Sequence, residues 1–200
     1  MAGKKAQINM RGLKAELGTK SKKILLPRIG AKAKMAVEEA KERLIEEFMS
    51  HLITQEIEAG SRATNMSQTL GGYGNLFSYI GFEQGSDPIA PIKNYLRRAV
   101  RLKKVNAQRL QFVLKVELPS KGDIIALSPV PWAPGRSWVD AMERGLSGLG
   151  HYLLTDSPFS RSGNAIQATV NLRGGSFQRV PYLSPMLKSI VPNIRTALNL

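Results

Sequence analysis

Hydrophobic positions between residues 28 and 53 follow the period of an α-helix. The apolar side chains recur at steps of three and four residues, and glutamates fall mostly between them. The apolar set is Ala33, Val37, Ala40, Leu44, Phe48 and Leu52. This pattern predicts a long amphipathic helix, whose apolar stripe must pack on a sheet, on other helices or on a neighbouring subunit.

Strands are predicted where apolar and polar residues alternate. Residues 110–118 alternate most regularly, and a turn at 119–122 predicts that they continue as a hairpin into 123–127. Aromatic and β-branched residues crowd segment 76–82, which predicts a short buried strand. Segment 164–172 alternates again and predicts a further strand.

Three more helices are predicted, over 91–105, 138–145 and 187–194. The second of these opens on Ser137 followed by Asp140, which resembles a capping box. The proline-rich stretch 128–136 predicts irregular structure. Helices and strands in this order predict an α+β fold, with a long N-terminal amphipathic helix and further helices packed on a mixed or antiparallel sheet.

The length of 200 residues favours one domain. Residues 1–27 lack a sustained period and are predicted to form a basic flexible arm, and residues 28–200 a single α+β domain. The chain has no cysteine, which excludes disulfides and thiolate metal sites. No stretch is apolar enough to span a bilayer, so we expect a soluble protein with no membrane partner.

The net charge of +14 is unevenly distributed. Basic residues gather in segments 1–34 and 93–121, and the glutamates of 35–60 lie between the two. Clustered Lys and Arg fit contact with DNA or with an acidic partner, and a solvated arm and helix face are the alternative. The candidate contact residues are Lys4, Lys5, Arg11, Lys14, Lys20, Lys22, Lys23, Arg97, Arg98, Arg101, Lys103 and Lys104.

The sequence contains few residues that could serve catalysis. The only histidines, His51 and His151, are each interpreted as local structural residues, and zinc or calcium ligand patterns are absent from the sequence. The stretch 145–150, GLSGLG, does not fit a nucleophile elbow, because leucine stands where the second glycine is needed. We therefore predict no enzyme, no catalytic residue, no metal and no cofactor. A hydrolase or nuclease using Asp123 or Asp140 is the weakest alternative.

Aromatic residues supply candidate subunit contacts, because Trp and Arg dominate binding energy at interfaces. Trp132 and Trp138 flank Arg136 in a proline-fixed segment, and the alternative is a loop pinned by two buried rings. Tyr73 and Phe77 belong to an aromatic cluster that also fits a core. The candidate interface residues are Tyr73, Phe77, Trp132, Arg136 and Trp138.

Three segments together resemble a known family. They are 51–60 (HLITQEIEAG), 70–89 (LGGYGNLFSYIGFEQGSDPI) and 132–153 (WAPGRSWVDAMERGLSGLGHYL). They look like parts of virion structural proteins of contractile-tailed double-stranded-DNA bacteriophages, and the nearest likeness is to neck or tail-completion proteins (head–tail connector or tail terminator). The likeness covers residues 33–153 in patches.

The resemblance implies a non-enzymatic subunit of a homo-oligomeric ring, hexameric or dodecameric, that joins phage head to tail. Its implied partners are other neck, portal or tail proteins, with non-specific contact to packaged DNA. Its implied place is the neck or tail region of the virion, after virus assembly in the host cytoplasm. The alternative function is a stand-alone basic nucleic-acid-binding protein.

Overall fold

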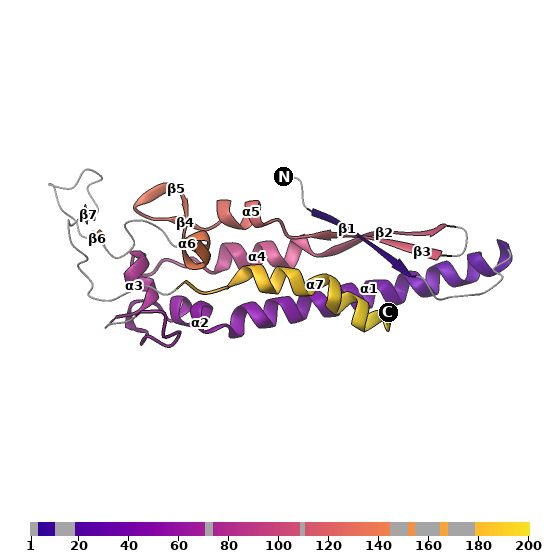
Figure 1. Cartoon of the computed structure of the whole chain (residues 1–200), viewed down its shortest axis with the longest axis horizontal. Coiled ribbons are helices and arrows are strands. Elements are labelled where there is room, and N and C mark those ends of the chain that lie inside the picture. Colours follow the sequence, from indigo (N-terminus) through magenta and orange to yellow (C-terminus); the bar gives the residue numbers. More distant parts are fainter. Residues whose placement is uncertain are drawn as a thin grey trace. The chain divides into compact units, whose positions relative to one another are not determined.

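A computed structural model describes residues 4–10, 19–70, 74–108, 111–144, 152–154, 165–167 and 179–200 (Figure 1). The fold is α+β, as the sequence predicts, with a long N-terminal helix packed against an antiparallel three-stranded sheet. The chain divides into two compact units. The first holds Met1–Glu47, Asn94–Ser120 and Pro185–Leu200, and the second holds Phe48–Lys93 and Lys121–Ser184.

The sheet of the first unit is made of β1 (Lys4–Met10), β2 (Arg101–Gln108) and β3 (Gln111–Leu118). Its order is β1-β3-β2 and both pairings are antiparallel. Strand β3 is central and supplies most of the buried face, because Phe112, Leu114 and Val116 alternate along it. Ile8 pairs with Leu114 in the register and extends that face onto β1.

Helix α1 (Thr19–Ser50) covers this unit with the stripe that its sequence period predicts. Ala33, Val37, Ala40, Leu44 and Phe48 are buried, whereas Leu52, the last residue of the predicted stripe, lies in the next helix, α2 (Leu52–Glu58), and is 51% exposed, because α1 ends at Ser50. Helix α7 (Leu183–Leu198) buries Ile190, Ile194 and Leu198, and the Nζ of Lys32 donates a hydrogen bond to the Leu198 carbonyl oxygen at 3.2 Å. The alternating strand and the amphipathic helix thus form the two layers of the first unit.

The second unit contains α2 (Leu52–Glu58), α3 (Leu76–Ile80), α5 (Lys121–Ala126) and α6 (Trp138–Arg144), with a 3-10 turn, Gly60–Arg62. Short strands β4 (Pro129–Val130) and β5 (Ala133–Ser137) pair with each other. Strands β6 (Tyr152–Leu154) and β7 (Ala165–Gln167) form a separate pair. Helix α4 (Ala90–Ala99) begins in the second unit and ends in the first.

Aromatic rings fill the core of the second unit. The Trp138 ring meets that of Phe82 edge-on at 6.0 Å between centroids and lies 6.1 Å from that of Tyr182. The Tyr182 hydroxyl is 2.5 Å from the hydroxyl of Thr54 on α2. Burial raises the pKa of Tyr182 far above its ordinary value, although the Thr54 hydrogen bond opposes this, so the phenol stays protonated.

A buried carboxylate holds the segment that follows α2. Glu56 is fully buried, and its Oε2 accepts a hydrogen bond from the Ser67 backbone N–H at 2.8 Å. Its Oε1 accepts another from the backbone N–H of Leu76 at 2.7 Å. One side chain thus satisfies two backbone donors, one in the segment after α2 and one at the start of α3.

The strand predicted at 76–82 is wrong, because residues 76–80 form α3. The Asn75 side chain caps the helix by accepting a hydrogen bond from the Ser78 backbone N–H at 2.9 Å. Gly81 closes it in the left-handed conformation, with φ of 89°. Capping groups at both ends therefore outweigh the strand preference of the aromatic residues between them.

The prediction of a hairpin after β3 is also wrong. Residues 121–126 form α5, and β3 pairs with the preceding strand β2 across residues 109–110. The helix predicted over 91–105 ends at Ala99, and its second half is β2. The basic residues before Val105 fit the polar face of a helix, so the alternation of Val105, Asn106 and Ala107 was interpreted as a continuation of that helix.

The predicted helices 138–145 and 187–194 and the predicted strand 164–172 keep their type where the structure describes them, whereas the prediction for stretch 128–136 is wrong. The Ser137 Oγ accepts a hydrogen bond from the Asp140 backbone N–H at 3.2 Å, which confirms the cap at the start of α6. The final helix is confirmed and is longer than predicted, with Pro192 inside it. Stretch 128–136, predicted irregular, contributes to the β4–β5 pair.

Helix α1 starts earlier than predicted and passes through Pro27. Residues 4–10 of the predicted arm form β1, because the long-range pairing with β3 supplies hydrogen bonds that no local pattern predicts. Residues 11–18 of that arm lie outside the described residues. Among the helices of the described part, none is both long and apolar enough to cross a bilayer.

Candidate polyanion-binding surface

Helix α4 leads into strand β2 of the first unit's sheet (Figure 1). The two elements and β3 carry several cationic residues. We call this set the cationic surface, and every member is exposed. Its members are Arg97 and Arg98 on α4, Arg101, Lys103 and Lys104 on β2, and Lys115 on β3. The structure thus brings together the predicted residues of the second basic segment and adds Lys115 to them.

The strand register sets two like charges against each other. Lys104 lies directly across from Lys115, whereas Arg101 lies across from Glu117. Residues directly opposite in an antiparallel pair project from the same face, and like charges there destabilise a sheet. A bound anion would remove that repulsion, so the Lys104–Lys115 pair is the point of this surface where an anion gains most.

An irregularity in β2 brings Lys103 to the same face. The register shifts between Leu102 and Lys104, as at a β-bulge. The Lys103 Nζ lies 3.2 Å from the Glu117 Oε2, which also accepts a hydrogen bond from the Arg101 Nε at 2.5 Å. The hydrogen bond from Arg101, helped by Lys103, lowers the pKa of Glu117.

Glu117 therefore compensates two cations and leaves others of the surface uncompensated. Within the described part of the chain, Arg97, Lys104 and Lys115 have no ion-pair partner. The Arg98 Nε donates to the Asn94 carbonyl oxygen at 3.1 Å, which orients its guanidinium along α4. The exposed ammonium and guanidinium groups of this surface can donate hydrogen bonds to phosphate or carboxylate groups.

The predicted contacts near the N-terminus fall into two elements. Lys4 and Lys5 belong to β1, where Lys5 is in register with Glu117, and Lys20, Lys22 and Lys23 belong to the first turns of α1. Arg11 and Lys14 lie outside the described residues. Lys115 lies in the predicted basic segment 93–121, but sequence reasoning did not name it among the contact residues.

The candidate interface residues have different surroundings. Phe77 and Trp138 are only 2% and 1% exposed, so the structure places them in the core of the second unit. The Trp132 side chain is half-buried, and its Nε1 donates to the Ile80 carbonyl oxygen at 2.6 Å. Arg136 is exposed, and Tyr73 lies outside the described residues.

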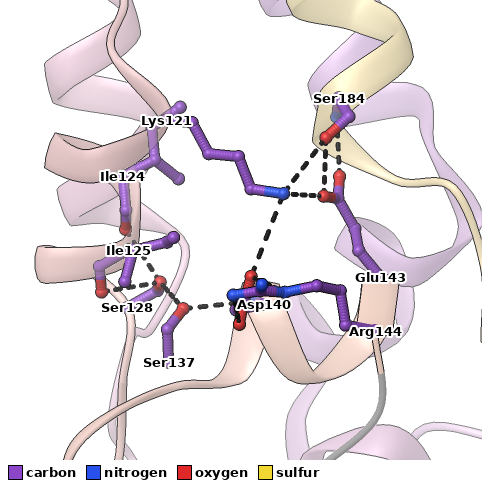
Figure 2. A network of polar contacts seen from close by, with 9 residues as sticks. All are labelled: Lys121, Ile124, Ile125, Ser128, Ser137, Asp140, Glu143, Arg144 and Ser184. Atoms are coloured by element: carbon purple, nitrogen blue, oxygen red, sulfur yellow. Dashed lines mark hydrogen bonds and ion pairs between the residues drawn. The ribbon is translucent and has the colours of Figure 1, made fainter.

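A second polar cluster joins α5, α6 and the start of α7 (Figure 2). The Glu143 Oε2 accepts hydrogen bonds from the Lys121 Nζ at 2.7 Å and from the Ser184 hydroxyl at 2.6 Å. Its Oε1 accepts one from the Ser184 backbone N–H at 2.6 Å. Burial raises the pKa of Glu143, but these hydrogen bonds outweigh it and lower the pKa overall. An ionised carboxylate thus caps α7.

The rest of this cluster is built from α6 and the turn before it. Asp140 pairs with Arg144, and its Oδ1 lies 3.9 Å from the Lys121 Nζ. The hydroxyls of Ser128 and Ser137 lie 2.6 Å apart, and the first donates to the Ile124 carbonyl oxygen (Figure 2). Each group binds a neighbour of the same unit, which describes a structural junction between helices.

His51 has the local role that the sequence suggested. It separates α1 from α2, and its Nδ1 accepts a hydrogen bond from the Ile53 backbone N–H at 3.2 Å. Its ring lies 4.9 Å from that of Tyr182. Burial lowers the pKa of His51, which favours the neutral form that this cap requires. His151 lies outside the described residues.

No protein-family model, no curated protein and no solved structure matches the chain. Within the described ranges, no group of three or more His, Cys, Asp and Glu residues is placed to hold a metal ion. The cationic surface is the candidate site, because its exposed cations and the Lys104–Lys115 register fit an anionic partner.

Proposed function

We propose that this chain is a non-enzymatic structural protein of a tailed-phage virion. It assembles into a ring in the neck or tail-terminator region, and the cationic surface faces DNA or an acidic neighbour. The proposal combines the resemblance of segments 51–60, 70–89 and 132–153 with an α+β subunit that carries an exposed cationic face.

The observation that carries the DNA contact is the Lys104–Lys115 pair. Two exposed lysines oppose each other in a strand register, and neither has an ion-pair partner among the described residues. A ring threaded by DNA needs cations toward its channel, and repetition around the ring multiplies a contact that is weak in one subunit. A stand-alone nucleic-acid-binding protein uses the same surface and is the second candidate.

The mass of the purified protein, measured by light scattering at two salt concentrations with and without duplex DNA, tests the assembly. We expect a closed oligomer of fixed mass without DNA. A subunit that is monomeric both in isolation and in virions would refute the ring. A monomer that gains mass only with DNA, and loses that gain in high salt, would favour the stand-alone binder.

The contact surface is tested by the salt dependence of DNA binding. The logarithm of the binding constant falls as the logarithm of salt concentration rises, and each phosphate neutralised contributes about −0.9 to that slope. The double variant Lys104→Gln with Lys115→Gln should therefore make the slope shallower by roughly 1.8. The matched control removes two exposed cations of α7, Lys188→Gln with Arg195→Gln. Equal slopes for the two double variants would show that DNA does not contact the lysine pair.

A further inference from the structure

The outer side of α1 carries a continuous exposed stripe. It lies opposite the buried stripe that covers the sheet, and all of its members belong to the first unit. The members are Ile24, Arg28, Ala31, Met35, Glu39, Glu42 and Glu46. Ile24 is 62% exposed and Met35 is 73% exposed, which makes them large apolar side chains with no cover.

The spacing of this stripe is symmetric about Met35. The steps between its members are four, three, four, four, three and four residues, so they are the same in both directions along the helix. Two copies of α1 that cross antiparallel at Met35 therefore place stripe residue against stripe residue along the whole contact. Met35 then meets Met35 of the second copy.

The charges of the stripe also favour the antiparallel arrangement. Its N-terminal half carries Arg28 and its C-terminal half carries glutamates. The antiparallel crossing sets Arg28 against Glu42 of the second copy. A parallel in-register pair would instead set Arg28 against Arg28 and Glu42 against Glu42.

The groups that would pair between copies are not used within the chain. In the part that the structure describes, neither Arg28 nor Glu42 has an ion-pair partner, whereas Glu39 is held by Arg43 at 2.7 Å. The small side chain of Ala31 allows two helices to approach closely. The opposite side of α1 is buried on the sheet, so the helix is held in place while its exposed stripe remains open to a partner.

We propose that a second copy of this chain docks on α1, antiparallel, through this stripe. The contact is two-fold, with the same residues on both sides, whereas the contacts that close a ring join different surfaces. The inference therefore goes beyond the proposed ring and does not depend on it. Each contact buries both exposed apolar side chains and forms two Arg28–Glu42 pairs.

Cysteine cross-linking tests the crossing point, because the natural chain has no cysteine to interfere. We expect Met35→Cys to form a disulfide-linked dimer under mild oxidation. Lys34→Cys is the matched control, since Lys34 is exposed but lies about 100° around the helix from Met35. Met35 is so exposed that its replacement should leave folding intact. Equal cross-linking of the two variants would overturn the proposal.

Charge exchange tests the pairing. Arg28→Glu and Glu42→Arg should each weaken self-association at least about tenfold, because each sets like charges against each other in the two-fold contact. An equimolar mixture of the two variants should associate again. In a mixed dimer, glutamate at position 28 of one variant faces arginine at position 42 of the other, and the natural Arg28 and Glu42 face each other at the other end of the contact. Sedimentation of each variant and of the mixture measures this. Single variants that associate like the natural chain, or a mixture no tighter than its parts, would overturn the proposal.

Discussion

Replacing Glu56 by glutamine tests whether a buried carboxylate organises the second unit. In Glu56→Gln one acceptor oxygen becomes an NH₂ donor, which then faces the backbone N–H of Ser67 or of Leu76. The unpaired N–H costs roughly 1–3 kcal/mol, and losing the charge on the remaining bond costs about 1 kcal/mol more. The neutral amide avoids burying a charge, which offsets part of this, so we expect a net loss of about 1–3 kcal/mol.

Urea unfolding measures the loss. With an m-value of about 2 kcal/mol per molar urea, the midpoint for the second unit should fall by roughly 0.5–1.5 M. Hydrogen exchange at the Ser67 and Leu76 amides should accelerate more than exchange at the amides of α2. Glu58→Gln is the matched control, because Glu58 lies on the same helix and is exposed. If the two variants unfold at the same urea concentration, the organising role of Glu56 is refuted.

Three further predictions concern the same unit. Burial lowers the pKa of His51, so below the ordinary pKa of 6.5 the folded state binds fewer protons than the unfolded state, and the stability of the protein should fall as pH drops through that value. Urea unfolding at pH 7.5 and at pH 5.5 should show a smaller fall in stability for His51→Asn than for the natural chain. An equal fall would contradict this. Asn75→Ala removes the cap of α3 and the two hydrogen bonds that the Asn75 Nδ2 donates to the Ser61 and Ala63 carbonyl oxygens, so it should cost at least about 1–2 kcal/mol by urea unfolding. Asn75→Asp keeps the capping acceptor but sets a carboxylate oxygen against those two carbonyl oxygens, so it should not restore the stability, and a variant as stable as the natural chain would contradict this. Trp138→Ala should cost about 3–5 kcal/mol, because the ring is buried among other rings, and Trp132→Ala should cost clearly less in thermal or urea unfolding.

Elements with a regular period were predictable from the sequence, and elements defined by pairing were not. The amphipathic stripe of α1 and the alternation of β3 both follow from burial on one side, which the sequence records directly. Strand β1 lacks such a record, since a single buried side chain, Ile8, is described on it and its hydrogen bonds come from β3. Capping by Asn75 and Gly81 likewise decided α3 against the preference of its aromatic residues.

The candidate site shows the same division. The basic segment 93–121 indicated most of the cationic surface, because charge density is visible in composition alone. The opposition of Lys104 and Lys115 depends on a register with a shift after Leu102, and no local pattern specifies that register. The role of Glu56 was missed for a similar reason, since it lies in a short helix beside the exposed Glu58 and its partners, Ser67 and Leu76, follow 11 and 20 residues later in the chain.

The pairing of β1 with β3 also sets the order in which the sheet can form during synthesis of the chain. Strands β2 and β3 are joined across residues 109–110, so they can close as soon as they are synthesised. Strand β1 emerges first yet pairs Met10 with Phe112, and it must wait for roughly 100 residues to follow. The first strand synthesised is thus the last to join its sheet, and α1 meets only part of its final surface until then.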